Sequence, residues 1–483
     1  MPSSLIVGLF ALVLLLSSTP VTPLNILTIP RSKQALAFRN GTPIIYRKAL
    51  GPKPNVIDGA GALASPATGD VMIIRTPNQS NGYDKIGIGV YNSGDTMYAV
   101  RVLCHHSEPL YDQLVGRKMV SDTDVIKAIV TSALSRCVAS RNAINLPSHG
   151  TDSFRLVNGE GDGLSGLCLD LYSDKLAVVM SSAAYVQLYK RPIVDAIKEI
   201  LGIESVVWKT TDSRLRQDGI EEQVEEENQN LDDTADPIVI HEVRVYNPHA
   251  TPTRSNPVSN LLHALKNGIK YNIQPIGSQK TGYYTDQRSN RQLLSQLSMN
   301  KRVLDLCCYV GSFSLNAAVN GGAQKCVGVD SSRDAIEQAK LNAELNSVAE
   351  TCDFRVSGIE EFMKQAIEDG DEYDVIVLDP PKLAPTVKSL DRASRKYMAL
   401  NRDAMKLVSS RGGILLTCTC SSAMSTKDGG QHFLNTIKRA SLAAGRHVSL
   451  HQRTHAAACH TTSPLEGSSN YLTAALISVA PLA

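Results

Sequence analysis

Two stretches of the chain carry residue types that could do covalent chemistry. Cys418 and Cys420 come directly after the apolar run Gly413–Thr417, and Asp379-Pro380-Pro381-Lys382 comes directly after the run Tyr373–Leu378. A thiolate is a good nucleophile, but a free cysteine with a pKa of about 8.5 needs a helix dipole or a base nearby to ionise at neutral pH. A carboxylate on a proline-stiffened turn can hold a flat base by its edge. The pattern favours a cysteine nucleophile beside a base-binding acid.

Spacing alone does not choose between the two cysteines. If strand geometry continues through Cys418 and Cys420, their side chains point to the same face. Position favours Cys420, because it lies farther past the buried run, where a sheet opens to its ligand edge. The remaining cysteines nearby, Cys307, Cys308 and Cys326, are expected to be inert core residues.

A βαβ unit at Lys301–Asn346 must position this chemistry. An apolar strand runs into a turn that ends at Gly311, a small-residue helix follows, and a second strand, Lys325–Val329, ends on Asp330. In such a unit the turn meets a ligand at the carboxyl edge of the sheet, and an acid after the second strand can hold ribose hydroxyls. The turn lacks the G-x-G-x-x-G dinucleotide fingerprint. S-adenosyl-L-methionine has no pyrophosphate and does not need that fingerprint.

Further strands extend the unit into a doubly wound α/β sheet. Apolar runs indicate strands buried on both faces, so Asp379 and Cys420 emerge at the same carboxyl edge as Asp330. A Gly-bearing turn just upstream feeds an apolar-periodic helix. Its polar residues that could reach a ligand are Gln279, Lys280, Thr281, Asp286, Gln287 and Arg288.

Strand, helix and turn patterns divide the rest of the chain into domains. Residues 37–109 carry short β-type runs separated by turns, and residues 110–245 carry an α+β pattern with a Gly-rich acidic turn at Asn158–Gly166, which we interpret as a hairpin connection. Residues 246–270 are expected to be an insertion or linker and residues 271–483 the α/β domain. An acid-rich tract at Glu221–Asp236 is expected to be solvated surface.

The N-terminus is predicted to be a leader. Leu5–Leu16 is an apolar run too short to span a bilayer, and six basic residues with no acid precede Asp58. The two signals in series predict a leader at residues 1–36 that directs the protein to an organelle. A plastid is favoured, with a mitochondrion or the secretory pathway as alternatives, and no stable membrane association is expected after the leader is removed.

Charge and cysteine content narrow the function. The whole chain is +2, but without residues 1–57 it has 43 basic against 47 acidic residues, or −4, so any RNA site must be a local patch. Ten cysteines show no C-x-x-C pairs, which argues against structural zinc and for free thiols in a reducing compartment. No metal site is predicted.

Five stretches carry a resemblance to a known family. They are DSFRLVNGEGDGLSGLCLD (Asp152–Asp170), GSQKTGYYTDQRSNR (Gly277–Arg291), DLCCYVGSFS (Asp305–Ser314), DVIVLDPPK (Asp374–Lys382) and LLTCTCSS (Leu415–Ser422). Through them the chain resembles the large-subunit ribosomal RNA cytosine-5 methyltransferase family, which has a PUA-like domain, a middle domain and a Rossmann-like class I methyltransferase domain. Departures from the family pattern are Thr42-Pro43-Ile44, Ser357-Gly358 and Cys459-His460.

The resemblance implies roles for residues in those stretches. Cys420 is the implied nucleophile, with Asp379 as its catalytic partner. Pro380, Pro381 and Lys382 are the implied substrate contacts. The implied contacts to S-adenosyl-L-methionine are Gln279, Thr281, Arg288, Asp305, Tyr309, Gly311, Asp330 and Asp379.

The function expected from the sequence is formation of 5-methylcytosine in ribosomal RNA through a cysteine adduct. Two alternatives stay open at this point. One is an amino-group or guanine methyltransferase, because acid-Pro-Pro turns also occur where nitrogen attacks the methyl donor directly. The other is a non-catalytic RNA-binding assembly factor that has kept the fold. A homodimer is an open alternative to a monomer.

Overall fold

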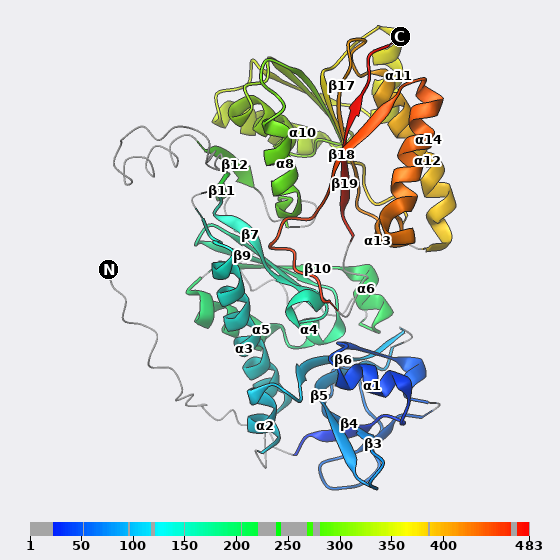
Figure 1. Ribbon diagram of the computed structural model, residues 1–483. Helices are drawn as coiled ribbons and strands as arrows, with labels where there is room; N and C mark the ends of the chain where they lie inside the picture. Colours follow the sequence, from blue (N-terminus) through cyan, green and yellow to red (C-terminus); the bar gives the residue numbers. More distant parts are fainter. Residues whose placement is uncertain are drawn as a thin grey trace.

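Three domains follow one another along the chain (Figure 1). The structure is a computed structural model that describes residues 23–51, 53–94, 97–116, 121–148, 150–203, 205–220, 238–242, 268–273, 281–384, 387–464 and 471–482. Among these residues, no helix has the length and apolar character needed to cross a membrane.

The N-terminal domain is a six-stranded sheet in the order β2-β6-β5-β4-β1-β3. Its elements are β1 (Asn25–Thr28), α1 (Lys33–Arg39), β2 (Ile44–Tyr46), β3 (Asn55–Ile57), β4 (Val71–Pro77), β5 (Tyr83–Tyr91) and β6 (Tyr98–His105). Strand β1 lies upstream of the domain boundary predicted at residue 37. It pairs in parallel with β4, and Leu27 and Ile29 are completely buried. The sheet of the first domain therefore includes Asn25–Thr28, which lie in the range expected to be leader.

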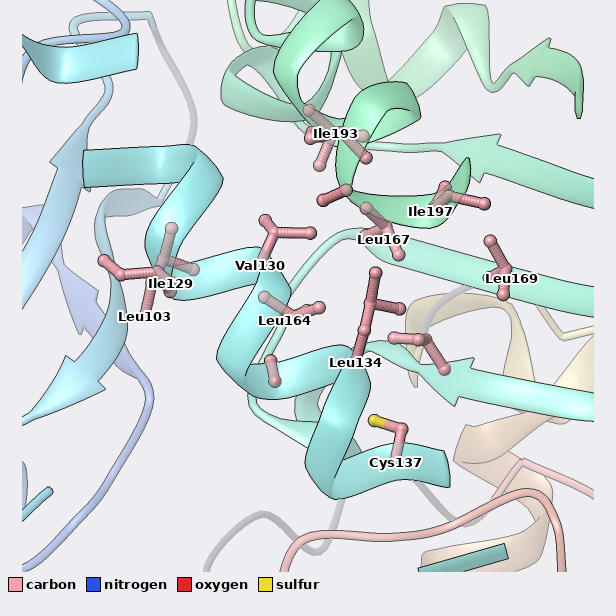
Figure 2. Packing of buried hydrophobic residues seen from close by; sticks show 14 of the residues in the cluster. Leu103, Ile129, Val130, Leu134, Cys137, Leu164, Leu167, Leu169, Ile193 and Ile197 are labelled. Carbon is pink, nitrogen blue, oxygen red and sulfur yellow. The ribbon is translucent and has the colours of Figure 1, made fainter. Parts of the chain in front are cut away.

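The middle domain packs helices on one face of the sheet β10-β9-β8-β7. Its elements are α2 (Pro109–Val115), α3 (Asp122–Ala143), β7 (Ser153–Asn158), β8 (Leu167–Tyr172), β9 (Leu176–Ser181), α4 (Ala184–Leu188), α5 (Lys190–Leu201), β10 (Ser205–Thr210) and α6 (Asp212–Gln217). Ser121 caps α3 by accepting a hydrogen bond from the Asp124 amide. Figure 2 shows Leu134 of α3 and Ile197 of α5 pointing toward Leu169 of β8, which fixes both helices on the sheet.

The Gly-rich acidic turn is the hairpin connection that the sequence predicts. It joins the antiparallel strands β7 and β8. Its Asp162 carboxylate accepts hydrogen bonds from the Arg141 guanidinium at 2.6 and 3.2 Å, and also from the Thr461 hydroxyl at 2.8 Å. The acid is therefore used to tie the middle domain to the C-terminal domain.

The C-terminal domain has a seven-stranded sheet in the order β15-β14-β13-β16-β17-β19-β18, with all strands parallel except β19. This confirms the predicted α/β fold. The elements are α8 (Arg288–Ser295), β13 (Arg302–Leu306), α9 (Ser312–Leu315), β14 (Lys325–Asp330), α10 (Arg333–Leu345), β15 (Cys352–Val356), α11 (Ile359–Glu368), β16 (Val375–Leu378), α12 (Leu390–Lys406), β17 (Gly413–Thr419), α13 (Ser422–Thr426), α14 (Gln431–Ala444), β18 (Val448–His455) and β19 (Thr473–Val479).

Side chains alternate between two cores along the central strands. Val375 and Val377 of β16 face the core beneath α8 and α10, whereas Ile376 and Leu378 face the core beneath α11, α12 and α14. Burial on both faces explains the continuous apolar runs. A separate pair of strands, β11 (Ile238–Glu242) and β12 (Ile269–Ile273), precedes the domain. Most of the predicted insertion at 246–270 lies outside the described residues.

Candidate active site

The turn after β13 is held in a conformation that side chains rarely adopt. Cys307, Tyr309 and Gly311 have φ values of 66°, 52° and 78°. A Cβ on Gly311 would lie 2.6 Å from the Phe354 ring, so only glycine fits. Both the backbone N–H and the hydroxyl of Ser314 donate to one carboxylate oxygen of Asp305, at 3.0 and 2.8 Å. The turn is therefore fixed before any ligand arrives.

Asp330 lies where the sequence predicts, at the end of β14 beside this turn. Its carboxylate accepts a hydrogen bond from the Tyr309 amide at 3.0 Å and another from the Ser332 amide at 2.9 Å. These bonds hold the acid at the carboxyl edge of the sheet. Predicted cofactor residues Asp305, Tyr309, Gly311 and Asp330 are thus brought together around one turn.

Asp305 has an unusual electrostatic environment. It is 1% exposed, and its Oδ1 has no hydrogen-bond partner among the residues that the structure describes. Burial raises the pKa of this carboxyl to about 7; the Ser314 hydrogen bonds oppose the rise, and the charges of Asp379 and Asp330 add to it. S-adenosyl-L-methionine carries a sulfonium and an ammonium group. A buried carboxylate oxygen near two further carboxylates fits such a cation.

Cys420 lies next to Asp379. The Cys420 thiol is 3.8 Å from Oδ1 of Asp379, and the Gln287 side-chain amide donates to Oδ2 at 2.9 Å. Asn290 in turn donates to Gln287 at 2.5 Å and accepts from the Thr454 hydroxyl at 2.6 Å. This chain of hydrogen bonds orients the Asp379 carboxylate, so that one oxygen faces the thiol.

The structure separates the two cysteines that spacing could not. Cys418 is fully buried within β17, and burial, followed by the charges of Asp379 and Cys420, raises the pKa of its thiol well above the ordinary value. β17 ends at Thr419, so Cys420 lies just past the strand and is half-buried. Of the two, Cys420 has the geometry of a nucleophile.

Two residues near the thiol were missed by sequence reasoning, Tyr284 and Tyr471. The Tyr471 hydroxyl donates to Asp286 at 2.6 Å, and burial raises the pKa of both tyrosines, with the charges of Asp286 and Cys420 adding to the rise. The Tyr284 ring meets the Tyr309 ring edge-on at 5.0 Å between centroids. Tyr471 is 185 positions from its partner Asp286 and stands in no motif, so no sequence signal marks it.

Two predicted cofactor residues have contacts in other directions. The Thr281 hydroxyl donates to Asp170 of the middle domain at 2.6 Å. The Arg288 guanidinium donates to the Ser153 carbonyl at 3.2 Å and lies 3.7 Å from the Cys459 thiol. These hydrogen bonds join the C-terminal domain to the middle domain, and the cofactor contacts of Thr281 and Arg288 stay predictions. Gln279 lies outside the described residues.

The predicted substrate residues line the loop after β16. Pro380 is buried, whereas Pro381 and Lys382 are exposed. Lys382 faces solvent; loss of hydration and then the charge of Arg214 lower its pKa, and the charge of Cys420 opposes them. Within the described ranges, no group of three or more His, Cys, Asp or Glu side chains is arranged to hold a metal ion.

Comparisons with known proteins agree with this geometry. A family profile described as "Methyltransferase domain" matches residues 297–462. Two solved structures cover 94% of this chain and 100% of their own at 17% identity. They are a Streptococcus mutans protein described as a SAM-dependent methyltransferase, with a TM-score of 0.67, and a methyltransferase complexed with SAH, with a TM-score of 0.66. Fold and site together define a class I methyltransferase whose cofactor is S-adenosyl-L-methionine.

Similarity to curated bacterial proteins shows which family of methyltransferases the chain belongs to. "Ribosomal RNA large subunit methyltransferase I" of Photobacterium profundum is 33% identical over 314 residues, which is 64% of this chain and 70% of that protein. The protein of the same name from Vibrio cholerae is 31% identical over 317 residues, which is 65% of this chain and 71% of that protein. The chain belongs to the ribosomal RNA large subunit methyltransferase I family.

Proposed function

We propose that this protein forms 5-methylcytosine in large-subunit ribosomal RNA by way of a covalent adduct between Cys420 and the base. The observation that carries the proposal is the contact between the Cys420 thiol and the oriented Asp379 carboxylate, 3.8 Å apart. Cytosine C5 is a poor nucleophile, so a thiol is needed to activate it. A methyltransferase acting on an amino group would have no use for this thiol.

The first step is attack of Cys420 on cytosine C6. Asp379 takes the thiol proton and passes it to N3 of the base as the carbon–sulfur bond forms, so that no charge accumulates on the ring. The resulting enamine carbon C5 then takes the methyl group from S-adenosyl-L-methionine, which supplies an electrophilic methyl when bound. S-adenosylhomocysteine is the other product.

The second step restores the aromatic base. A base removes the C5 proton, the carbon–sulfur bond breaks, and Cys420 leaves as a thiolate. The N3 proton returns to Asp379, and the thiolate then recovers it. The side chain that took the C5 proton releases it to solvent, so the protein ends as it began. Tyr284 and Tyr471 lie close enough to Cys420 for its charge to raise their pKa values, and they help to exclude water from the adduct.

The RNA must present its target outside the base stack. Methylation at C5 needs access to both faces of the ring, so unpaired or opened RNA is expected. Pro380 and Pro381 stiffen the turn against which the base lies, and Lys382 provides a positive charge at its entrance. The β-rich N-terminal domain is proposed to act as a PUA-like RNA-binding module in an organelle, with a plastid favoured and a monomer or homodimer as the assembled form.

Mass mapping of ribosomal RNA tests this function. RNA from cells with and without the protein is digested, and fragments that differ by one methyl group are sequenced. A single cytosine that loses a C5 methyl group supports the proposal. Loss of a methyl group from guanine or from an amino group supports the non-covalent alternative, and no change in the presence of normal S-adenosyl-L-methionine binding supports the assembly-factor alternative.

A further inference from the structure

The middle of β18 is exposed on both faces in the part of the chain that the structure describes. β18 is the last strand in the order of its sheet, next to β19, and Ser449–Arg453 are all exposed. Successive side chains of a strand point to opposite faces, so five exposed residues in a row leave neither face covered. The strand at the other margin, β15, differs, because Cys352 and Phe354 are buried. β18 thus presents an open edge strand.

The chain around this strand carries positive charge. Between Asp428 and Glu466 the sequence has no acidic residue. The exposed cationic and imidazole side chains in this segment are Lys438, Arg439, His447, His451 and Arg453. In the described ranges no carboxylate lies within ion-pair distance of these cations, whereas Arg355 on β15 pairs with Asp353 at 2.7 Å. The surface along β18 therefore fits a ligand with negative charge.

Two contacts hold the Arg453 guanidinium against the turn between α13 and α14. Its Nη1 donates to the Gly429 carbonyl at 2.9 Å. A Cβ on Gly430 would lie 2.8 Å from the same nitrogen and 3.1 Å from the Ser425 carbonyl, so the glycine leaves room for the guanidinium beside the end of α13. Ser425 is five positions after Cys420, which is about 8 Å along a helix. The exposed arginine is thus fixed a short distance from the nucleophile.

The same end of β18 reaches the active site. The Thr454 hydroxyl donates to Asn290 at 2.6 Å. Asn290 donates to Gln287, and Gln287 donates to the Asp379 carboxylate at 2.9 Å. β18 runs parallel to β17, because each of them is antiparallel to β19. The carboxyl end of β18 therefore lies at the sheet edge that carries the nucleophile, and the open strand leads to that edge from one side of the domain.

We propose that the exposed part of β18, with Arg453 at its end nearest the active site, binds the phosphate backbone of RNA that flanks the target nucleotide. The inference rests on the proposed function, since it takes RNA to be the substrate. Cations without acidic partners suit phosphates, and such contacts position the RNA without reading its sequence. Among Ser449–Arg453 only Leu450 is apolar, whereas the centre of a protein–protein interface is apolar and poor in charge. RNA is therefore a better occupant than a protein.

Salt-dependent RNA binding tests this surface. The probe is an unmodified single-stranded RNA of twelve nucleotides, titrated without cofactor at several salt concentrations. Arg453→Gln should lower the slope of log affinity against log salt by about 0.7 and weaken binding about fivefold at about 0.1 M salt. Arg453→Lys keeps the charge and should keep the slope. Arg355→Gln is the matched control, because it removes an exposed arginine that Asp353 already balances from the other edge strand, and its slope should equal that of wild type.

The slope separates a charge role from a structural one. Loss of the hydrogen bond to Gly429 alone would loosen the turn and lower the melting temperature, but it would not change the number of phosphates that are contacted. Equal slopes for wild type and Arg453→Gln would overturn the proposal and leave the arginine as a charge that protects an edge strand from pairing. A wild-type dimer that Arg453→Gln abolishes, with the RNA slope unchanged, would assign the strand to a second copy and overturn the proposal as well. The readout needs no methyl transfer, so a protein that shows the predicted slopes but does not methylate cytosine contradicts the proposed function alone.

Discussion

The buried carboxyl of Asp305 makes cofactor binding depend on pH. Its pKa is raised to about 7, chiefly by burial, so the group is largely protonated at pH 6 and largely ionised at pH 8. A cationic cofactor favours the ionised form. Binding should therefore release protons near neutral pH, and it should tighten as the pH rises.

The size of the effect follows from the ionised fraction. With a pKa of about 7, roughly a tenth of the carboxyl is ionised at pH 6 and roughly nine tenths at pH 8. If the ionised form binds, affinity should rise about tenfold over this interval, or about 1.4 kcal/mol. Folding stability of the apo protein changes with pH in the opposite direction. Because the pKa of Asp305 is higher in the folded state than in the unfolded state, this group lowers the stability progressively as the pH rises from about 4 to about 7.

Calorimetry in buffers of different ionisation enthalpy measures both affinity and proton release. Asp305→Asn keeps an oxygen that can accept from Ser314 but cannot ionise, so it should lose the part of the pH dependence that Asp305 supplies. Comparison with this variant also removes any contribution from the amino group of the cofactor itself. Wild-type and Asp305→Asn proteins with the same pH profile between pH 6 and 8 would refute the reasoning.

Three other outcomes are expected. Asp330→Ala should weaken S-adenosyl-L-methionine binding tenfold or more, about 1.5 to 3 kcal/mol, and leave RNA binding unchanged; equal affinities in calorimetry would remove Asp330 from the site. Gly311→Ala should cost at least about 1 to 2 kcal/mol of folding stability from its positive φ alone, with partial recovery when Phe354→Leu makes room; a denaturant midpoint equal to wild type would contradict this. A chain that begins at residue 23 should fold, whereas one that begins at residue 37 loses buried Leu27 and Ile29, worth about 3 to 6 kcal/mol together, and should melt at a clearly lower temperature.

The last of these results also bears on the leader. Removal of a leader that ended at residue 36 would take β1 out of the sheet. Cleavage before residue 25 would instead leave the first domain intact. A fusion of residues 1–60 to a fluorescent reporter tests the organellar address. Appearance of the reporter only in the cytosol or the medium would contradict it.

The central sheet could be predicted because strands buried on both faces leave unbroken apolar runs, and parallel strands deliver their last residues to one edge. That reasoning placed Asp330, Asp379 and Cys420 together. It did not foresee the hydrogen bond from Thr281 to Asp170, because Asp170 belongs to another domain and lies 111 positions away. Local patterns carry periodicity and turn chemistry, but they do not say which face of a polar turn another domain will cover.

The choice between Cys418 and Cys420 shows the same limit on a smaller scale. Residue spacing could not show that β17 ends at Thr419. Because the strand ends there, the Cys418 thiol lies in the core and the Cys420 thiol lies next to Asp379. The domain boundary predicted at residue 37 meets a related limit. Composition marked Asn25–Thr28 as leader, whereas the sheet needed a strand beside β4.

Covalent trapping tests the central claim most directly. RNA that carries 5-fluorocytosine at the target position is incubated with enzyme and S-adenosyl-L-methionine, and adducts are resolved by denaturing electrophoresis and mass spectrometry. Fluorine blocks the removal of the C5 substituent that releases the enzyme, so the wild-type protein and Cys418→Ala should accumulate an adduct, and Cys420→Ala should give none. An adduct that survives in Cys420→Ala and disappears in Cys418→Ala would contradict the assignment of the nucleophile, and methylation that persists in both variants would contradict the covalent mechanism.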